Sequence, residues 1–159
     1  MVKARPQPSS ERVRLRFRRQ KTRDTRPEMA LRRELFRRGM RYRVNYPVPG
    51  LPRRTIDITF PRQRLAIFVD GCFWHGCPIH GVPPKANAEW WREKIDRNRV
   101  RDSETTQLLT EHAWRVLRVW EHDVRNNLLV VAGSVEQALS DLVSPKAASQ
   151  PIPNRKGGL

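Results

Sequence analysis

A short apolar run at residues 65–69 constrains the fold of this chain more than any other feature. The run reads LAIFV and holds no polar side chain, so a strand made from it must be covered on both faces. It ends in Asp70 and continues into a ten-residue loop, GCFWHGCPIH, that carries two imidazoles, two thiols and large aromatic rings. A buried strand that ends in an acid and opens into such a loop is a common way to present chemistry.

The segments before this strand predict one helix and two further strands. Thr25 and Glu28 have the spacing of a capping box, which predicts a helix that ends at Gly39. Apolar residues alternate with polar ones over 40–44 and again over 55–60, and each of these patterns predicts a strand.

The segments after the loop predict two helices and one strand. Periodic apolar residues indicate a long helix over 87–111, and alternation predicts a strand over 114–120. Ser134 and Gln137 have capping-box spacing, which predicts a short helix that ends at Val143. The order helix, three strands, helix, strand, helix indicates an α/β fold: a small mixed β-sheet flanked by helices.

The length of 159 residues suits one domain with its own core. We expect residues 24–143 to form this domain, residues 1–23 to be a basic, flexible arm, and residues 144–159 to be a disordered tail. No stretch approaches the ~20 apolar residues that span a bilayer, and the N-terminus lacks the apolar core of a signal peptide. We therefore expect a cytoplasmic protein, and a monomer, because no spare hydrophobic face is evident.

The charge of the chain indicates a polyanionic partner. The formal net charge is +16, and sixteen of the 32 Lys and Arg residues fall within residues 3–43. Most are arginines, whose planar guanidinium grips phosphate in a fork, so nucleic acid is the favoured partner. An anionic membrane is the alternative, but it requires an apolar face, and the arm offers only Val13, Leu15 and Phe17.

Two carboxylates and a histidine are candidates for catalysis. Asp57 lies in the strand predicted over 55–60, on the face opposite Phe60 and the two isoleucines; it could be an ordinary solvent-facing residue. Asp70 ends the neighbouring strand, so the two acids could meet at one edge of the sheet and share Mg²⁺. His75, in the same loop as Asp70, could transfer a proton at a metal-bound water, or only bond a neighbouring carbonyl.

Other residues indicate a zinc site. Cys77 and His80 have the Cys-x-x-His spacing with which one turn supplies two ligands to tetrahedral zinc. The second pair must come from elsewhere, and the candidates are His122, after the last strand, and Asp102, in the long helix. A site with no position left for water would be structural. Cys72 is interpreted instead as a small buried thiol packed behind the loop.

Two aromatic pairs, Phe73-Trp74 and Trp90-Trp91, could serve DNA binding. Proteins that distort duplex DNA push such rings between base pairs, although core packing is the alternative for one member of each pair.

Three polar residues, Lys94, Asn98 and Asp102, recur every four residues on one face of the long helix. This face is either solvated or turned toward DNA and the edge of the sheet.

The motif DGCFWHGCPxH, with TRDTxxE upstream and WRVLxVWE downstream, resembles the very short patch repair (Vsr) DNA mismatch endonucleases. The resemblance covers about residues 13–123 and implies a restriction-endonuclease-like core. It also implies a bacterial, nucleoid-associated enzyme that uses Mg²⁺ to nick one strand of duplex DNA beside a T·G mismatch. Asp57 would be the central metal-binding carboxylate, beside the Val69 carbonyl. His75 would be catalytic, and Glu28 would help to order the metal-bound water.

The resemblance also assigns binding residues. It implies a structural Zn²⁺ held by Cys77, His80, Asp102 and His122. The rings that wedge into DNA near the mismatch would be Phe73, Trp74 and Trp91, with Phe17 entering from the other groove. Asp70 departs from the family, because the best-known member has a second catalytic histidine there; an acid at this place could ligate Mg²⁺ more directly.

The sequence therefore predicts a Mg²⁺-dependent, strand-nicking endonuclease whose partner is mismatch-containing double-stranded DNA. Two alternatives stay open. One is a nuclease of the same core with another DNA target, such as a restriction-type site or a branched structure. The other is a zinc-stabilised DNA-binding module without catalysis.

Overall fold

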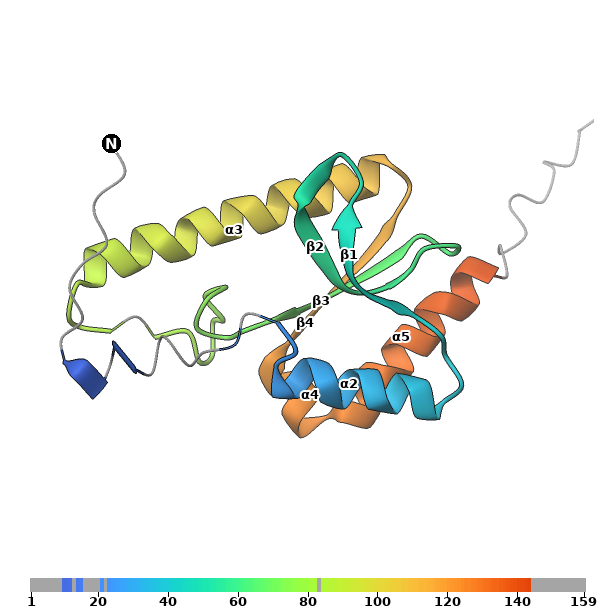
Figure 1. Ribbon diagram of the computed structural model, residues 1–159, viewed down its shortest axis with the longest axis horizontal. Coiled ribbons are helices and arrows are strands. Elements are labelled where there is room, and N and C mark those ends of the chain that lie inside the picture. The colour runs from blue at the N-terminus through green and yellow to red at the C-terminus, as the bar shows by residue number, and fades with distance from the viewer. Residues whose placement is uncertain (1–9, 13, 16–20, 22, 83, 144–159) are drawn as a thin grey trace, which may run out of the picture.

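The computed structural model describes residues 10–12, 14–15, 21, 23–82 and 84–143. Four strands form one mixed sheet, with α3 on one face and α2, α4 and α5 on the other (Figure 1). The strands are β1 (Arg43–Val48), β2 (Leu51–Phe60), β3 (Leu65–Asp70) and β4 (Arg115–Trp120). The helices are α2 (Arg26–Arg37), α3 (Ala88–Glu111), α4 (Glu121–Asn126) and α5 (Leu128–Val143).

The strands lie in the order β1-β2-β3-β4. The pairs β1–β2 and β2–β3 are antiparallel, whereas β3 and β4 are parallel and joined by a crossover that contains α3. This arrangement confirms the prediction of an α/β fold with a small mixed sheet between helices.

The strand β3 is buried along its whole length, as its composition predicts. Leu65, Ile67 and Val69 pack with α2, α4 and α5, while Ala66 and Phe68 face the second core beneath α3. Both cores therefore depend on one strand, and each fully buried aliphatic side chain contributes about 1.5–3 kcal/mol.

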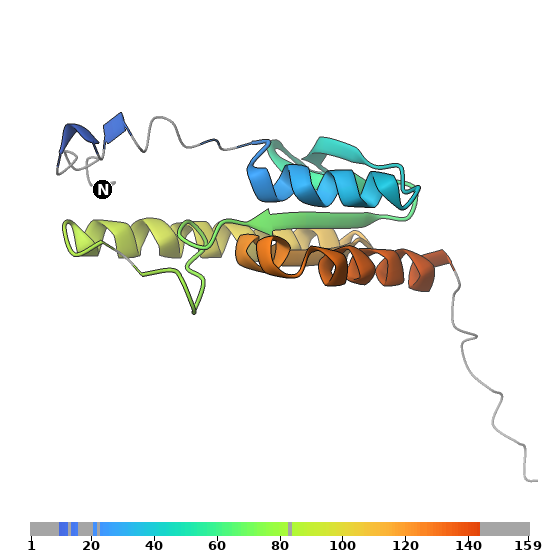
Figure 2. The same cartoon turned by 90° about the horizontal axis from the view of Figure 1, so that it is seen from below.

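Helix α3 extends beyond the sheet and contacts the loop that follows β3. Figures 1 and 2 both show its N-terminal half projecting past the strands, with the segment that follows β3 beside it. Polar groups of α3 bond to carbonyls of this segment. The loop is thus held between the end of the sheet and the projecting helix.

The predicted limits of several elements were wrong. β1 begins at Arg43 rather than at residue 40, and α4 was not predicted. The last helix, α5, begins at Leu128, so Ser134 lies inside it and not at its N-terminus. There the Ser134 hydroxyl donates to the Val130 carbonyl at 3.1 Å, a local bond that serine makes within helices as well as at caps. The capping of α2 by Thr25 is confirmed.

The expectation that Ile56, Ile58 and Phe60 share one face of β2 is wrong for Ile56. Ile56 packs in the core beneath α3, whereas Ile58 and Phe60 pack on the opposite face of the sheet. The alternation breaks at Asp57, whose Oδ2 accepts the Val69 N–H at 2.9 Å. A side chain thus takes the place of a backbone carbonyl where β2 and β3 separate.

Most of the predicted arm, including Phe17, and the predicted tail lie outside the described residues, so both stay predictions. Within the described part of the chain, none of the helices has both the length and the apolar character needed to cross a membrane.

Candidate active site and metal centre

A cavity of about 270 Å³ opens where β3 ends. The four residues predicted to be catalytic all line it, on α2, β2, β3 and the following loop. The charged or titratable residues of its wall are Glu28, Arg53, Arg54, Asp57, Asp70, His75, Arg101, Asp102 and Arg118.

Asp57 lines this cavity just beyond the point where the pairing of β2 with β3 stops. Burial raises the pKa of Asp57 to about 6; the Val69 N–H opposes the rise, and the negative charges of Glu28 and Asp70 add to it. The hydrogen bond from Val69 uses Oδ2. A buried carboxylate that is hard to ionise, beside other acids, favours a cation as its partner.

Glu28 reaches the same cavity from the first turn of α2 and is buried. Its carboxylate accepts hydrogen bonds from the Thr25 hydroxyl and the Asp24 N–H, both at 3.0 Å. Arg32 donates to Oε2 at 3.1 Å. Glu28 is therefore both part of the helix cap and an acid of the cavity, and its charge is compensated by Arg32.

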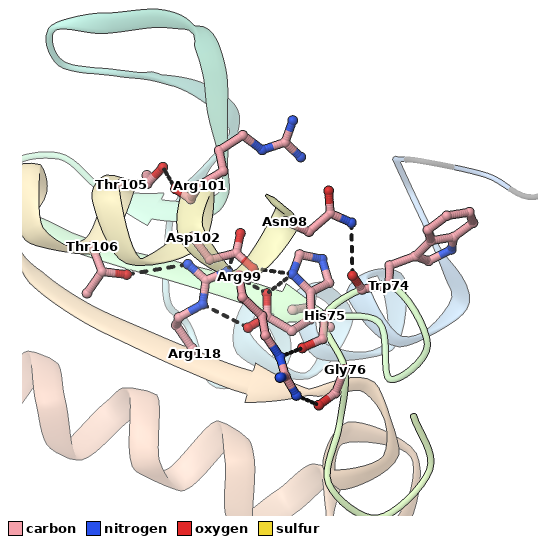
Figure 3. Close-up of polar contacts among 12 residues, drawn as sticks. Trp74, His75, Gly76, Asn98, Arg99, Arg101, Asp102, Thr105, Thr106 and Arg118 are labelled. Atoms are coloured by element: carbon pink, nitrogen blue, oxygen red, sulfur yellow. Dashed lines mark hydrogen bonds and ion pairs between the residues drawn. The ribbon is translucent and has the colours of Figure 1, made fainter. Parts of the chain in front are cut away.

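Asp70 is ion-paired with Arg118 of the neighbouring strand β4. Nε of Arg118 donates to Oδ2 at 2.8 Å, and Nη2 donates to Oδ1 at 2.7 Å. The same Nη2 lies 3.1 Å from Oδ1 of Asp102, and Figure 3 shows the guanidinium between Asp102 and Thr106. Burial opposes the charge of Arg118, but the bond to Asp70 and the charges of both carboxylates outweigh it and raise the Arg118 pKa.

His75 forms a pair with Asp102 of α3 (Figure 3). Burial disfavours the ionised form of Asp102, but the hydrogen bond with His75 and the charge of Arg118 prevail and lower the pKa of Asp102. An ionised carboxylate only accepts hydrogen bonds, so Nδ1 of His75 carries the proton and Nε2 is left for a substrate. Carboxylate–imidazole pairs of this kind orient a general base or acid.

The polar face of α3 points at the loop rather than only at solvent. Asn98 Nδ2 donates to the Trp74 carbonyl at 2.9 Å, and Asp102 bonds to His75 one turn later. Lys94, one turn before Asn98, is half-buried. This face therefore positions the loop.

Gly76 allows α3 and the loop to approach closely. Its φ is +63°, and a Cβ there would lie 2.7 Å from the Arg99 guanidinium and 2.8 Å from Ile95. The approach lets Arg99 donate to the Gly76 carbonyl at 2.6 Å. Only glycine adopts this backbone at such close range without strain.

A second group of ligand atoms lies beside the loop. One atom each from Cys72, Cys77, His80 and His122 lie within 4.8 Å of one another. The Sγ atoms of Cys72 and Cys77 are 3.1 Å and 3.7 Å from Nδ1 of His122. Two sulfurs and two imidazole nitrogens are the donor set of a structural, tetrahedral zinc, so these residues fit that ion.

The expectation that Asp102 belongs to the zinc site is corrected by this arrangement. Asp102 lies with Asp70 and His75 at the cavity, and Cys72 joins the sulfur and imidazole group in its place. Cys72 is brought there because its N–H donates to Oε1 of Glu121, next to His122, at 2.9 Å. Cys72 is buried, as its interpretation as a packed thiol predicts, and it also lies within reach of the other three ligand atoms.

The four predicted aromatic residues form one cluster between the loop and the start of α3. The Phe73 ring centre lies 5.1 Å from those of Trp74 and Trp91, in edge-to-face contacts, and Trp90 packs edge-on against Trp91 at 4.8 Å. Trp91 is 9% exposed, whereas Phe73 and Trp74 are half-buried. Trp91 thus supports the cluster, and Phe73 and Trp74 present the more accessible rings.

The chain is similar in sequence to known proteins. The model of the family described as DNA mismatch endonuclease Vsr matches residues 9–80. The type II nicking enzyme V.XorIIP of Xanthomonas oryzae pv. oryzae is 38% identical over 140 residues, 86% of this chain and 96% of that protein. The DNA mismatch endonuclease Vsr of Escherichia coli is 35% identical over 134 residues, 82% of this chain and 83% of that protein. The type II nicking enzyme V.NaeI of Lentzea aerocolonigenes is 47% identical over 102 residues, 62% of this chain and 61% of that protein.

The chain belongs to the Vsr endonuclease family. The Vsr fold is restriction-endonuclease-like, which confirms the predicted core. The enzyme class predicted from sequence, a DNA strand-nicking hydrolase, agrees with relatives that are named nicking enzymes and endonucleases.

The sequence interpretation did not include the arginines of this cavity, of which Arg118 has the most contacts with the predicted acids. A signal for it was present, because Arg118 is a charged residue within the alternating strand RVLRVW. In the parallel register Arg118 lies opposite Phe68, two residues before Asp70. The parallel pairing of the two strands would have been needed to recognise this neighbour.

Proposed function

We propose that this protein nicks one strand of duplex DNA beside a T·G mismatch in very short patch repair, with a catalytic Mg²⁺ and a structural Zn²⁺. The observation that carries the proposal is the cavity at the end of β3, which joins Asp57, Glu28 and the His75–Asp102 pair. Family membership supports DNA as the substrate.

Asp57 is the residue that would hold Mg²⁺, together with the Val69 carbonyl. The fit rests on burial, because the Asp57 carboxylate is costly to ionise without a cation. When bound, Mg²⁺ would supply Lewis-acid stabilisation of the phosphate charge and a more acidic water. In this proposal Glu28 would help to orient that water, and Nε2 of His75 would take or return its proton.

The rim of the cavity is suited to the DNA backbone. Arg53 and Arg101 line it and are exposed, so their guanidinium groups are available to bind backbone phosphates. Arg54 instead ties β2 to α3, since it donates to Thr105 Oγ1 at 2.8 Å and to Glu104 at 2.9 Å. The phosphate contacts of Arg53 and Arg101 would supply affinity for DNA but little sequence preference.

Phe73 and Trp74 are the rings that we expect to enter the duplex. A T·G pair stacks less rigidly than a Watson–Crick pair, so unstacking it costs less, by about 1–3 kcal/mol. A wedge that must unstack bases turns this difference into selectivity. The zinc ligands Cys72 and Cys77 flank both rings in the sequence, so a bound Zn²⁺ would fix the base of the wedge.

The proposal is tested with end-labelled duplexes that are identical except for a central T·G, T·A or C·G pair, or another mismatch. In Mg²⁺ we expect one nick, beside the T·G pair. Asp57→Ala should abolish nicking and leave DNA affinity nearly unchanged, because it removes the metal ligand and not a phosphate contact. The control is Asp96→Ala, which changes an acid that is 70% exposed on α3.

Each rival function predicts a different pattern. Equal nicking of matched and mismatched duplexes would identify a nuclease of the same core with another target. Binding without nicking at any Mg²⁺ concentration would identify a non-catalytic, zinc-stabilised module. An undiminished nicking rate in Asp57→Ala would remove the metal site proposed here.

A further inference from the structure

The Asp70 carboxylate has an unusual position for a metal ligand. It is 7% exposed, and both of its oxygens accept hydrogen bonds from the Arg118 guanidinium, at 2.7 Å and 2.8 Å. This bidentate arrangement is the strongest and most directional pairing that a carboxylate makes with a side chain. The lone pairs that remain on these oxygens belong to a carboxylate whose charge Arg118 already neutralises, and the guanidinium would repel a second cation bound there.

Arg118 also contacts residues other than Asp70. Its guanidinium carbon lies 4.6 Å from the centre of the Phe68 ring, its Nη1 lies 3.5 Å from Thr106 Oγ1, and its side chain is 23% exposed. Its Nη2 also lies 3.1 Å from Asp102. One cation therefore joins β4 to β3 through Asp70, and to α3 through Asp102.

Asp102 in turn fixes the histidine of the cavity. Its Oδ1 faces Arg118 and its Oδ2 bonds to Nδ1 of His75. The same Nδ1 lies 3.7 Å from Asp70 Oδ1. A carboxylate that is anchored at one oxygen holds its partner imidazole at a defined angle.

We propose that Arg118 is a positioning residue of this active site, and that Asp70 acts through Arg118 rather than as a second Mg²⁺ ligand. Asp70 fixes the orientation of the guanidinium. The guanidinium then fixes the orientation of the Asp102 carboxylate, which fixes that of the His75 ring. The inference rests on the proposed nicking reaction for its kinetic test, but not for its metal-binding test.

The metal-binding test uses the zinc-loaded protein without DNA, with Mn²⁺ as the probe, titrated by calorimetry and electron paramagnetic resonance. Asp57→Asn should lose Mn²⁺ binding, since it neutralises the proposed ligand. Asp70→Asn should keep the Mn²⁺ affinity within about twofold of the wild type, because in the wild type both Asp70 oxygens accept hydrogen bonds from Arg118 instead of binding the metal. A loss of tenfold or more in Asp70→Asn, like that in Asp57→Asn, would make Asp70 a ligand and overturn the inference.

The kinetic test is a double-mutant cycle on single-turnover nicking of the T·G duplex. Asp70→Asn and Arg118→Leu should each lower the maximal rate by about tenfold or more, with the apparent affinity for DNA unchanged. The double variant should be no slower than the slower single variant, because both act through one contact. Arg118→Lys should not restore the rate, since an ammonium cannot form the fork to Asp70 and still reach Asp102.

The matched control is Arg115→Leu, on the same strand. Arg115 is 40% exposed and pairs with Asp141 of α5 at 3.1 Å, away from the cavity, so its variant should nick at the wild-type rate. Wild-type nicking by Arg118→Leu, or additive losses in the double variant, would refute the positioning role. If Arg118→Leu does not fold, Asp70→Asn and Arg118→Lys decide by the same criteria. If the wild type nicks nothing, the proposed function fails, while the Mn²⁺ titration still decides the role of Asp70.

Discussion

Replacement of Asp57 by asparagine should make the Mg²⁺-free protein more stable, although it removes the proposed metal ligand. Asparagine keeps an oxygen that can accept the Val69 N–H, now at 2.9 Å from Asp57, but carries no charge. Burial raises the pKa of Asp57 from 3.8 to about 6. At ~1.36 kcal/mol for each pKa unit, the wild type loses about 3 kcal/mol of folding free energy when Asp57 ionises.

The sign of the pH dependence follows from which state ionises first. Below about pH 4 Asp57 is protonated in both states, so the wild type and Asp57→Asn should differ little. As the pH rises the unfolded chain loses this proton before the folded chain does. The wild type therefore becomes less stable than Asp57→Asn. Above about pH 7 the gap should reach its full size, which corresponds to roughly 6–12 °C in the unfolding temperature.

The assay is urea unfolding of both proteins between about pH 4 and pH 8, with zinc bound and without added Mg²⁺. Chelators are avoided because they would remove zinc. Asp96→Asn, which changes an exposed acid, should show no such pH dependence. A gap between wild type and Asp57→Asn that is constant with pH, or a more stable wild type at pH 7, would refute the reasoning. Added Mg²⁺ should stabilise the wild type and not the variant.

Two further predictions concern the loop after β3. Trp74→Ala should lower the ratio of nicking on T·G to nicking on matched duplex by about tenfold, measured on paired substrates, because it removes an accessible ring of the wedge; an equal loss on both substrates would make Trp74 a core residue only. Cys72→Ala should reduce the zinc content, by metal analysis, from about one ion per chain and lower stability by about 2 kcal/mol or more; unchanged zinc would exclude Cys72 as a ligand.

The fold could be predicted for those elements whose structure is determined by the residues of one short segment. The run at 65–69 admits only a strand covered on both faces, and β3 is buried throughout. Thr25 and Glu28 are close in sequence, and they do cap α2. Ser134 misled the prediction because its hydroxyl finds the Val130 carbonyl within α5, and the sequence pattern is the same for a cap and for this internal bond.

The candidate zinc ligands show that spacing predicts only those neighbours that are close in the sequence. Cys77 and His80 are three residues apart, so their proximity follows from one turn of chain. Their two partners come from 45 and 5 residues away from Cys77, as His122 and Cys72. Nothing local distinguishes Cys72 from Asp102 as the fourth donor. That choice depends on how β3, α3 and α4 pack, which only the tertiary structure determines.

Charge compensation explains why the acids of the cavity have different roles. Glu28, Asp57, Asp70 and Asp102 line one small space, and four carboxylates so close together cannot all stay ionised without cations. Arg32 pairs with Glu28, and Arg118 pairs with both Asp70 and Asp102. Among the described residues, no lysine, arginine or histidine forms an ion pair with Asp57, and its pKa is the one that burial raises to about 6. The position that lacks a protein cation is therefore the position where an external divalent ion gains most.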